Sequence, residues 1–293
     1  MENGALLKLY NQTRIKRSEI AQLIVLHHIF SHKVSVDLFF QGGTALRWCY
    51  GGTRFSEDLD FVTIMTTPAL SHLLKGLSRK IRADMIAHFG KGDFLLNEKE
   101  SVRDESYRSF IEFKAEKSRE KISVKVEFER LKEALRPDAS LMILSSLPAV
   151  GYLLGSGEFK IPTPSSILQV ETLEEILSDK IRALMERTYV KGRDYYDVWF
   201  LTRTLGVGVN IDLVKRKLTL YEAPFTMLRT PDDYISFETW NDHDKAEILA
   251  GIESDLSRFI PQNIIAVFKA QRFQDLLSSV QDVFVKVKQG LSL

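Results

Sequence analysis

Residues 42–62 (GGTALRWCYGGTRFSEDLDFV) carry most of the information about the architecture of this chain. They follow a short apolar run, residues 36–40 (VDLFF), which predicts a buried strand ending in a glycine turn at Gly42-Gly43. The residues from Thr44 onward predict the start of a helix. After a loop at residues 51–53, residues 58–62 alternate polar and apolar side chains, which predicts a second strand with one solvent-facing side.

Two carboxylates occupy alternate positions of this second strand. Side chains at positions i and i+2 of a strand share a face, so Asp58 and Asp60 would repel each other unless a cation lay between them. Carboxylate oxygens suit Mg²⁺, and also Mn²⁺. Two such ions can activate an attacking oxygen and stabilise a leaving pyrophosphate. The pair therefore predicts a metal site.

The glycine turn supplies the complementary half of a nucleotide site. A strand, a turn and a helix start together offer backbone N–H groups and the positive end of a helix to a phosphate. Glycine at positions 42 and 43 would let a triphosphate approach the main chain without meeting a Cβ atom, and Thr44 adds a hydroxyl group. Each of these features is common alone, but their order predicts nucleotide binding.

A third carboxylate is expected from a neighbouring strand. Residues 121–130 (KISVKVEFER) alternate apolar and charged side chains, and residues 122–128 within them predict a strand that pairs in antiparallel fashion with residues 109–113. We favour Glu127 over Glu129 as a metal ligand because it lies nearer the middle of the strand. The alternative is that these charges lie on a solvated face of the sheet.

The rest of the chain predicts an α+β fold in two parts. Helical spacing of apolar residues occurs at 19–31 and 68–89. Glycines and prolines within residues 153–166 mark a change of organisation, so we expect a core domain at 1–165 and a helical domain at 166–293. The helices expected in the second part are residues 173–187, 193–204, 211–221, 244–259 and 263–288.

Composition limits the possible classes of protein. The 293 residues are 44% hydrophobic and 27% charged, which is typical of a globular protein. The single cysteine, Cys49, excludes an intramolecular disulfide and a thiolate metal cluster. No apolar run reaches the ~20 residues that span a bilayer, and no signal segment is visible, so we expect a cytoplasmic chain without a membrane span. The net charge of +1 gives RNA binding no support.

Three blocks of the sequence resemble the AbiEii/AbiGii-type (MenT-like) nucleotidyltransferase toxins. They are the stretch quoted above, residues 174–187 (EEILSDKIRALMER) and residues 193–201 (RDYYDVWFL), in the order typical of the family. The resemblance covers about residues 37–204. It implies a polymerase-β-like nucleotidyltransferase core with a mixed sheet, followed by a mainly helical C-terminal region.

The resemblance also implies roles for individual residues. A nucleotide and metal site would comprise Gly42, Gly43, Thr44, Arg54, Ser56, Asp58 and Asp60. Many members have serine where Thr44 stands. Lys180 would contact the triphosphate, and Asp194 and Asp197 would complete the far side of the cleft, Asp197 either in catalysis or by shaping the cleft. The residues alone would instead make Lys180 a solvated lysine and Asp194 a helix cap.

The function that the resemblance implies is that of a toxin from a toxin–antitoxin system, with a cognate antitoxin protein as partner. It would transfer a nucleoside monophosphate from an NTP to an RNA, at the 3′ end of a tRNA. This hypothesis predicts a basic strip beside the cleft and an RNA affinity that falls steeply with salt. The arginines expected there are Arg47, Arg54, Arg182 and Arg187.

Two alternatives remain from the sequence. A protein side chain or a small molecule would replace RNA as the acceptor, which the near-neutral charge allows. A nucleotide-binding module without catalysis is the other, and the retained pair Asp58 and Asp60 argues against it.

Overall fold

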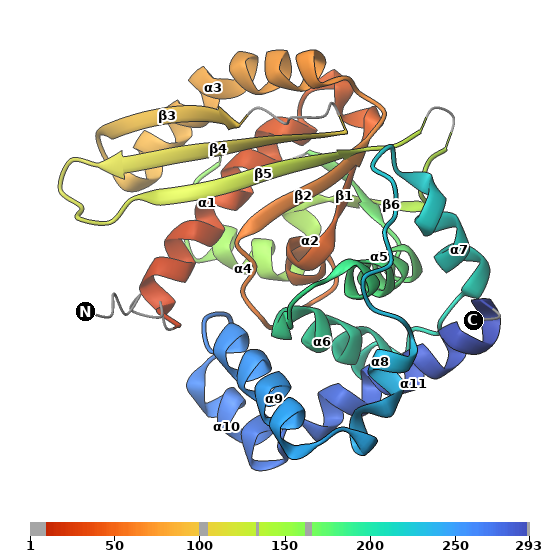
Figure 1. Cartoon of the computed structure of the whole chain (residues 1–293). Helices are drawn as coiled ribbons and strands as arrows, with labels where there is room; N and C mark the ends of the chain where they lie inside the picture. The colour runs from red at the N-terminus through yellow and green to blue at the C-terminus, as the bar shows by residue number, and fades with distance from the viewer. Residues whose placement is uncertain (1–9, 100–104, 133–134, 162–165, 292–293) are drawn as a thin grey trace, which may run out of the picture.

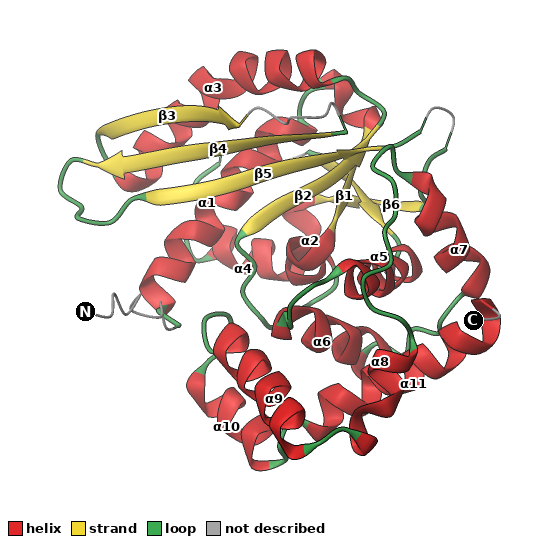
Figure 2. Cartoon of the chain, viewed as in Figure 1, coloured by secondary structure: helices red, strands yellow, loops and turns green. Residues whose placement is uncertain are grey.

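A computed structural model describes residues 10–99, 105–132, 135–161 and 166–291 of the chain. Within these ranges seven strands form one mixed sheet, in the spatial order β3-β4-β5-β2-β1-β7-β6 (Figure 2). The strands are β1 (Leu38–Gln41), β2 (Asp58–Thr63), β3 (Gly92–Lys99), β4 (Ser106–Ala115), β5 (Ile122–Arg130), β6 (Ala139–Ile143) and β7 (Ile167–Glu171). β2 is parallel to β5 and antiparallel to β1, which confirms the mixed sheet.

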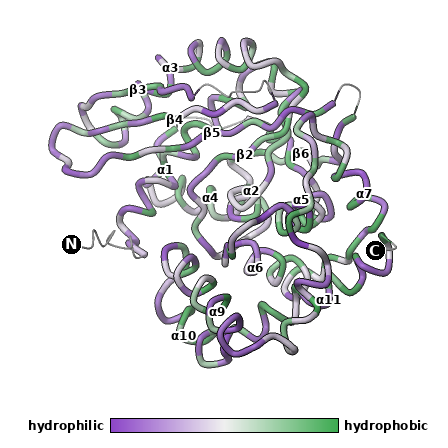
Figure 3. The backbone as a smooth tube through the Cα atoms, in the orientation of Figure 1, coloured by the Kyte–Doolittle hydropathy of each residue, from purple (hydrophilic) through white to green (hydrophobic). Residues whose placement is uncertain are grey.

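Helices from the first half of the chain cover one part of this sheet. α1 (Gln12–Phe30) and α3 (Thr67–Phe89) pack against each other and against β3, β4 and β5. Both helices bury apolar residues at helical spacing, among them Leu23 and Leu74. The hairpin between β4 and β5 is hydrophilic (Figure 3) and carries the charges of residues 116–121. The short helices α2 (Gly42–Cys49) and α4 (Pro148–Gly155) complete this half.

The second half is mainly helical, as expected. Figure 1 shows α9, α10 and α11 gathered below the sheet, with α5 and α6 between them and the central strands. α6 contacts both α9 and α11, and α5 contacts α7. The helices are α5 (Leu173–Glu186), α6 (Gly192–Trp199), α7 (Ile211–Leu220), α8 (Asp232–Ile235), α9 (Asp242–Leu256), α10 (Gln262–Ala270) and α11 (Gln274–Leu291).

The two halves share one hydrophobic core. A single cluster of buried side chains includes Phe40 and Phe61 from the sheet together with Ile181 and Phe284 from the helical half. The expected domain boundary at 165/166 falls at the edge of residues 162–165, which lie outside the described residues. Beyond it, β7 still belongs to the sheet, where it pairs with β1 and β6.

The prediction of one helix over residues 263–288 was wrong, because α10 and α11 are separate helices. Arg272 and Phe273 between them have φ angles of 49° and 56°. This left-handed conformation places the Cβ atom too close to the carbonyl oxygen for a helix to continue. Burial of the Phe273 side chain in the core offsets part of that cost.

No helix in the described part of the chain is long and apolar enough to cross a membrane.

Candidate active site

The glycine turn joins β1 to α2, and both glycines lie in tight surroundings. Gly42 has a φ of 77°, and a Cβ atom there would lie 2.8 Å from Oδ2 of Asp60. A Cβ atom on Gly43 would overlap the guanidinium group of Arg54. Glycine is therefore required at both positions, but the space beside Gly43 belongs to Arg54. Gly42 alone of the two lines the cavity described below.

The two hydroxyl-bearing residues expected at the nucleotide, Thr44 and Ser56, are buried. Thr44 donates a hydrogen bond to the carbonyl oxygen of Asp58, which ties α2 to the start of β2. The carbonyl oxygen of Ser56 accepts a hydrogen bond of 2.6 Å from Gln22 Nε2. Neither Thr44 nor Ser56 lines the cavity. Both hold the loop that carries the carboxylates.

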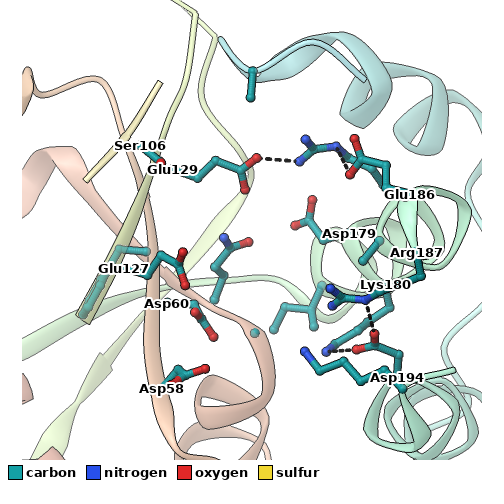
Figure 4. Close-up of a pocket in the computed structure, with 18 of the residues that line it drawn as sticks. Asp58, Asp60, Ser106, Glu127, Glu129, Asp179, Lys180, Glu186, Arg187 and Asp194 are labelled. Atoms are coloured by element: carbon teal, nitrogen blue, oxygen red, sulfur yellow. Dashed lines mark hydrogen bonds and ion pairs between the residues drawn. The ribbon is translucent and has the colours of Figure 1, made fainter. Parts of the chain in front are cut away.

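Three carboxylates form an acidic wall on the face of the sheet that the cavity exposes. Asp58 and Asp60 alternate along β2, and the parallel register with β5 places Glu127 directly beside Asp60. Lys125 lies beside Asp58 in the same register. Its ammonium group is 3.6 Å from Asp58 Oδ2 and contacts Glu127, which also accepts a hydrogen bond of 2.9 Å from Arg108 Nε. Figure 4 shows the three carboxylates on one side of the cavity.

The electrostatics of this wall indicate crowded negative charge. Burial, followed by the charges of Asp58 and Glu127, raises the pKa of Asp60 to about 7. Burial alone would raise the pKa of Glu127 as well, but the charges and hydrogen bonds of Lys125 and Arg108 outweigh it and lower that pKa. Glu129 turns to a different partner, because Arg182 Nη1 donates a 2.8 Å hydrogen bond to it.

The acidic wall has the donors that a divalent cation needs. Asp58, Asp60 and Glu127 offer carboxylate oxygens, which Mg²⁺ and Mn²⁺ prefer, and burial together with the charges of Asp58 and Glu127 raises the pKa of Asp60. Among the described residues, no three His, Cys, Asp or Glu side chains already converge as metal ligands. The ammonium of Lys125, in contact with Glu127, supplies the local counter-charge.

The opposite wall is a network of ion pairs on α5 and α6. Asp197 accepts hydrogen bonds of 2.5 and 2.6 Å from Nε and Nη2 of Arg54, and the Lys180 ammonium lies 2.7 Å from Asp197 Oδ2. Asp194 pairs with Lys180 and with Arg187, each at 3.0 Å. Figure 4 shows Lys180 and Arg187 meeting Asp194 across from Asp58 and Asp60.

This network buries its carboxylates without raising their pKa values. Desolvation would favour the protonated forms, but the neighbouring cations outweigh it and lower the pKa values of both Asp194 and Asp197. Asp197 and Arg54 are buried and do not line the cavity. Lys180 and Asp194 do line it. Asp197 thus holds Arg54 and Lys180 in place, and only Lys180 of these two cations reaches the cavity.

A cavity of about 670 Å³ lies between the two walls. It is lined by Gly42, by the three carboxylates of the acidic wall and, on the opposite wall, by Lys180, Asp194, Arg187 and Lys191. The volume lies within the range of about 300–1,000 Å³ that is usual for ligand sites. Two clusters of opposite charge thus face one space, so the cations of one could bind phosphate groups and the carboxylates of the other could bind a metal ion.

A scan against family models matches residues 25–279 to "Nucleotidyl transferase AbiEii toxin, Type IV TA system". The chain belongs to this AbiEii family. Two crystal structures from Helicobacter pylori share its fold. JHP933 is 17% identical, with a TM-score of 0.54 over 97% of both chains. A "putative nucleotidyltransferase" is 18% identical, with a TM-score of 0.51 over 95% of this chain and 98% of the other. No curated protein sequence matches.

The basic strip expected of this AbiEii-family chain is largely neutralised. Arg47 donates a 2.8 Å hydrogen bond to Glu19 and does not line the cavity. Arg54 pairs with Asp197, and Arg187 pairs with Asp194. Arg182 lies near Glu129 and Glu186. All four arginines therefore have carboxylate partners.

Lys191 is a cavity residue that the sequence patterns did not single out. It lies two residues before the RDYYD block of the AbiEii chain and, like Asp194, lines the cavity. It forms no ion pair with any described residue. Burial lowers the pKa of its ammonium group to about 8, although Asp194 acts in the opposite direction. The only signal in the sequence was its position next to a family block.

Proposed function

We propose that this AbiEii-family chain transfers a nucleoside monophosphate from an NTP to the 3′ hydroxyl group of an RNA, with the 3′ end of tRNA as the acceptor. The observation that carries the proposal is the single cavity that joins Asp58, Asp60 and Glu127 to Lys180 and Lys191. Carboxylates suit the reacting phosphorus, and lysines suit the departing phosphates.

The proposed reaction is a substitution at the α-phosphorus of the NTP. The acceptor oxygen forms a bond to this phosphorus, the bond to the bridging α–β oxygen breaks, and pyrophosphate leaves. One carboxylate of the acidic wall takes the proton of the acceptor hydroxyl. Lys180 and Lys191 bind the β- and γ-phosphates and stabilise the charge that develops there. Asp58, Asp60 and Glu127 would hold Mg²⁺ or Mn²⁺, which would supply further positive charge at the reacting phosphate.

Three features of the biological setting belong to the same proposal. The family description names a type IV toxin–antitoxin system, so we infer a cognate antitoxin protein as partner. An NTP substrate and a tRNA acceptor place the reaction in the cytoplasm. Modification of tRNA 3′ ends would stop aminoacylation and therefore translation.

Incubation with each labelled NTP, Mg²⁺ and total RNA tests the proposal. We expect label in tRNA with the wild-type protein, and none with Asp58→Asn or when EDTA replaces Mg²⁺. Label in protein or in small molecules would show a nucleotidyltransferase with another acceptor. Absence of label in every fraction, with intact nucleotide binding, would indicate a non-catalytic module.

A further inference from the structure

A second cavity lies on the other side of Asp58. Its volume is about 630 Å³, close to that of the first. Asp58 and Lys125 line both cavities, so this pair forms the partition between them. The binding of an NTP in the first cavity leaves the second without an occupant.

The register of the sheet places an aromatic ring beside this partition. Phe110 of β4 lies opposite Lys125 of β5, and Lys125 lies opposite Asp58 of β2. Directly opposed residues of neighbouring strands share a face. The ring, the ammonium group and the carboxylate therefore form one row across the sheet. Arg108, Glu127 and Asp60 form the next row, which belongs to the first cavity.

Phe110 is an unusual residue for its position. Its neighbours Ser109 and Ile111 are buried on the core face of β4, whereas Phe110 is half-buried and lines the second cavity. A second ring, Phe55, forms part of the same lining and stacks on Phe259 with centroids 6.4 Å apart. The cavity thus offers a flat apolar surface close to the carboxylate that both cavities share.

Charge alone does not define the occupant of this cavity. Its cations are matched in number by its carboxylates: Arg14, Lys121 and Lys125 against Glu57, Asp58 and Glu120. A site for an isolated phosphate would carry an excess of cations. A nucleotide end fits better, because its base stacks on an aromatic ring, its phosphate accepts from scattered cations and its ribose needs polar partners.

The geometry of phosphoryl transfer sets where the acceptor enters. The attacking and leaving oxygens lie roughly in line on opposite sides of the phosphorus, so the acceptor must approach from the side away from pyrophosphate. The lysines that would bind the pyrophosphate line the first cavity, across from the acidic wall. We propose that the second cavity binds the 3′-terminal nucleotide of the RNA acceptor, with its base against Phe110 and its 3′ hydroxyl at Asp58. This assignment rests on the proposed function.

Binding measurements test the assignment without turnover. The probe is a short fluorescent single-stranded RNA with a free 3′ hydroxyl, titrated with the wild-type protein and with Phe110→Ala. Stacking of one base on one ring corresponds to a loss of about five- to a hundredfold in RNA affinity. Phe110→Trp should retain RNA binding. The affinity for a non-hydrolysable NTP analogue should stay the same in both variants, because the analogue binds in the other cavity.

A matched control removes an aromatic ring elsewhere. Tyr152 on α4 is 72% exposed and lines neither cavity, so Tyr152→Ala should leave RNA affinity unchanged. Equal RNA affinity of the wild type and Phe110→Ala, in a protein that labels RNA, would overturn the acceptor site and leave the proposed function intact. A wild-type protein that labels no RNA would instead overturn the proposed function. A parallel loss of NTP affinity and thermal stability in Phe110→Ala but not Phe110→Trp would assign the ring to folding and overturn the acceptor site.

Discussion

At the scale of single residues, the acidic wall contains two carboxyl groups with opposite pKa shifts. Asp60 is buried next to two other carboxylates, and its pKa rises to about 7, whereas cations hold the pKa of Glu127 low. A carboxyl group with a raised pKa binds its proton more tightly in the folded state than in the unfolded state. The metal-free protein therefore loses stability as pH rises from about 4 to about 7, through the two pKa values of Asp60.

Asp60→Asn should remove this loss. We expect the melting temperature of the metal-free variant to exceed that of the wild type, with a difference that grows from pH 4 to pH 7 and then stays constant. Nucleotide transfer should disappear in the same variant. Thermal melts in EDTA across this pH range measure the effect, and Asp93→Asn, at an exposed position on β3, is the control. The same dependence of melting temperature on pH in Asp60→Asn and in the wild type would contradict the prediction.

Lys191 gives a prediction for nucleotide binding. Its pKa of about 8 means that the ammonium group loses its proton as pH rises through that value, so the NTP affinity of the wild type should fall there. Lys191→Met should weaken NTP binding by about ten- to a hundredfold at pH 7, the usual effect of a charge-assisted hydrogen bond, and should abolish the pH dependence. Lys191→Arg should bind NTP equally at pH 7 and pH 9. Calorimetric titrations at both pH values test this. If the NTP affinity of Lys191→Met fell with pH as steeply as that of the wild type, Lys191 would not be the source of the pH dependence.

The sequence could predict the positions of some site residues and not the partners of others. The period of two along a strand placed Asp58 and Asp60 on one face of their strand and Glu127 on the charged face of its own, because this depends only on local backbone geometry. The pairing of β2 with β5, which brings Glu127 beside Asp60, is not local. The pairing of Arg54 with Asp197, 143 positions apart, depends on how α6 packs against the loop before β2. No local pattern contains that information, so Arg54 was expected at the nucleotide and lies instead behind the cavity wall.

At the scale of elements, the ion pair of Arg54 and Asp197 ties α6 to this loop. A nearby hydrogen bond of 2.7 Å between Thr53 and Tyr196, also on α6, reinforces the contact. Removal of Asp197 would leave Arg54 and Lys180 buried without one of their carboxylates. Asp197→Ala should therefore lower the free energy of unfolding by about 3–5 kcal/mol, as is typical when one partner of a buried pair is removed.

Urea denaturation measures this loss. The control is Asp282→Ala, which removes an exposed partner of Arg203 and should cost less than about 1 kcal/mol. If Asp197→Ala kept wild-type stability and lost only transfer activity, Asp197 would act in catalysis and not as a support for the wall.

Elements with strong periodicity were the easiest to predict. The antiparallel pair at 109–113 and 122–128 was confirmed as β4 and β5, because alternating side chains distinguish a half-buried strand. β6 and β7 were not predicted, since both are five residues long and lie next to glycine- and proline-containing segments. The break between α10 and α11 was also missed, because Arg272 and Phe273 are not residues that usually adopt a left-handed conformation.

At the scale of the whole molecule, the shared hydrophobic core predicts cooperative unfolding. Trp48 lies in α2 and Trp199 in α6, and both belong to or pack against the same cluster. We consider two variants, each of which retains one of these tryptophans and carries phenylalanine at the other two tryptophan positions. In each variant, fluorescence and circular dichroism should give the same denaturation midpoint. Two separate transitions within one variant, seen by fluorescence and circular dichroism, would show that the halves unfold independently.

Lys125 makes the affinity of the acidic wall for a divalent ion a matter of competition. Its ammonium group is tethered to β5, already sits against Glu127 and lies 3.6 Å from Asp58. Under the proposed function, a diffusing Mg²⁺ ion would have to displace this internal counterion before both carboxylates could bind it. The concentration of free Mg²⁺ needed for half-maximal transfer would therefore exceed what the carboxylates alone would require. Lys125 would thereby set an ionic threshold below which the folded, nucleotide-bound protein stays idle.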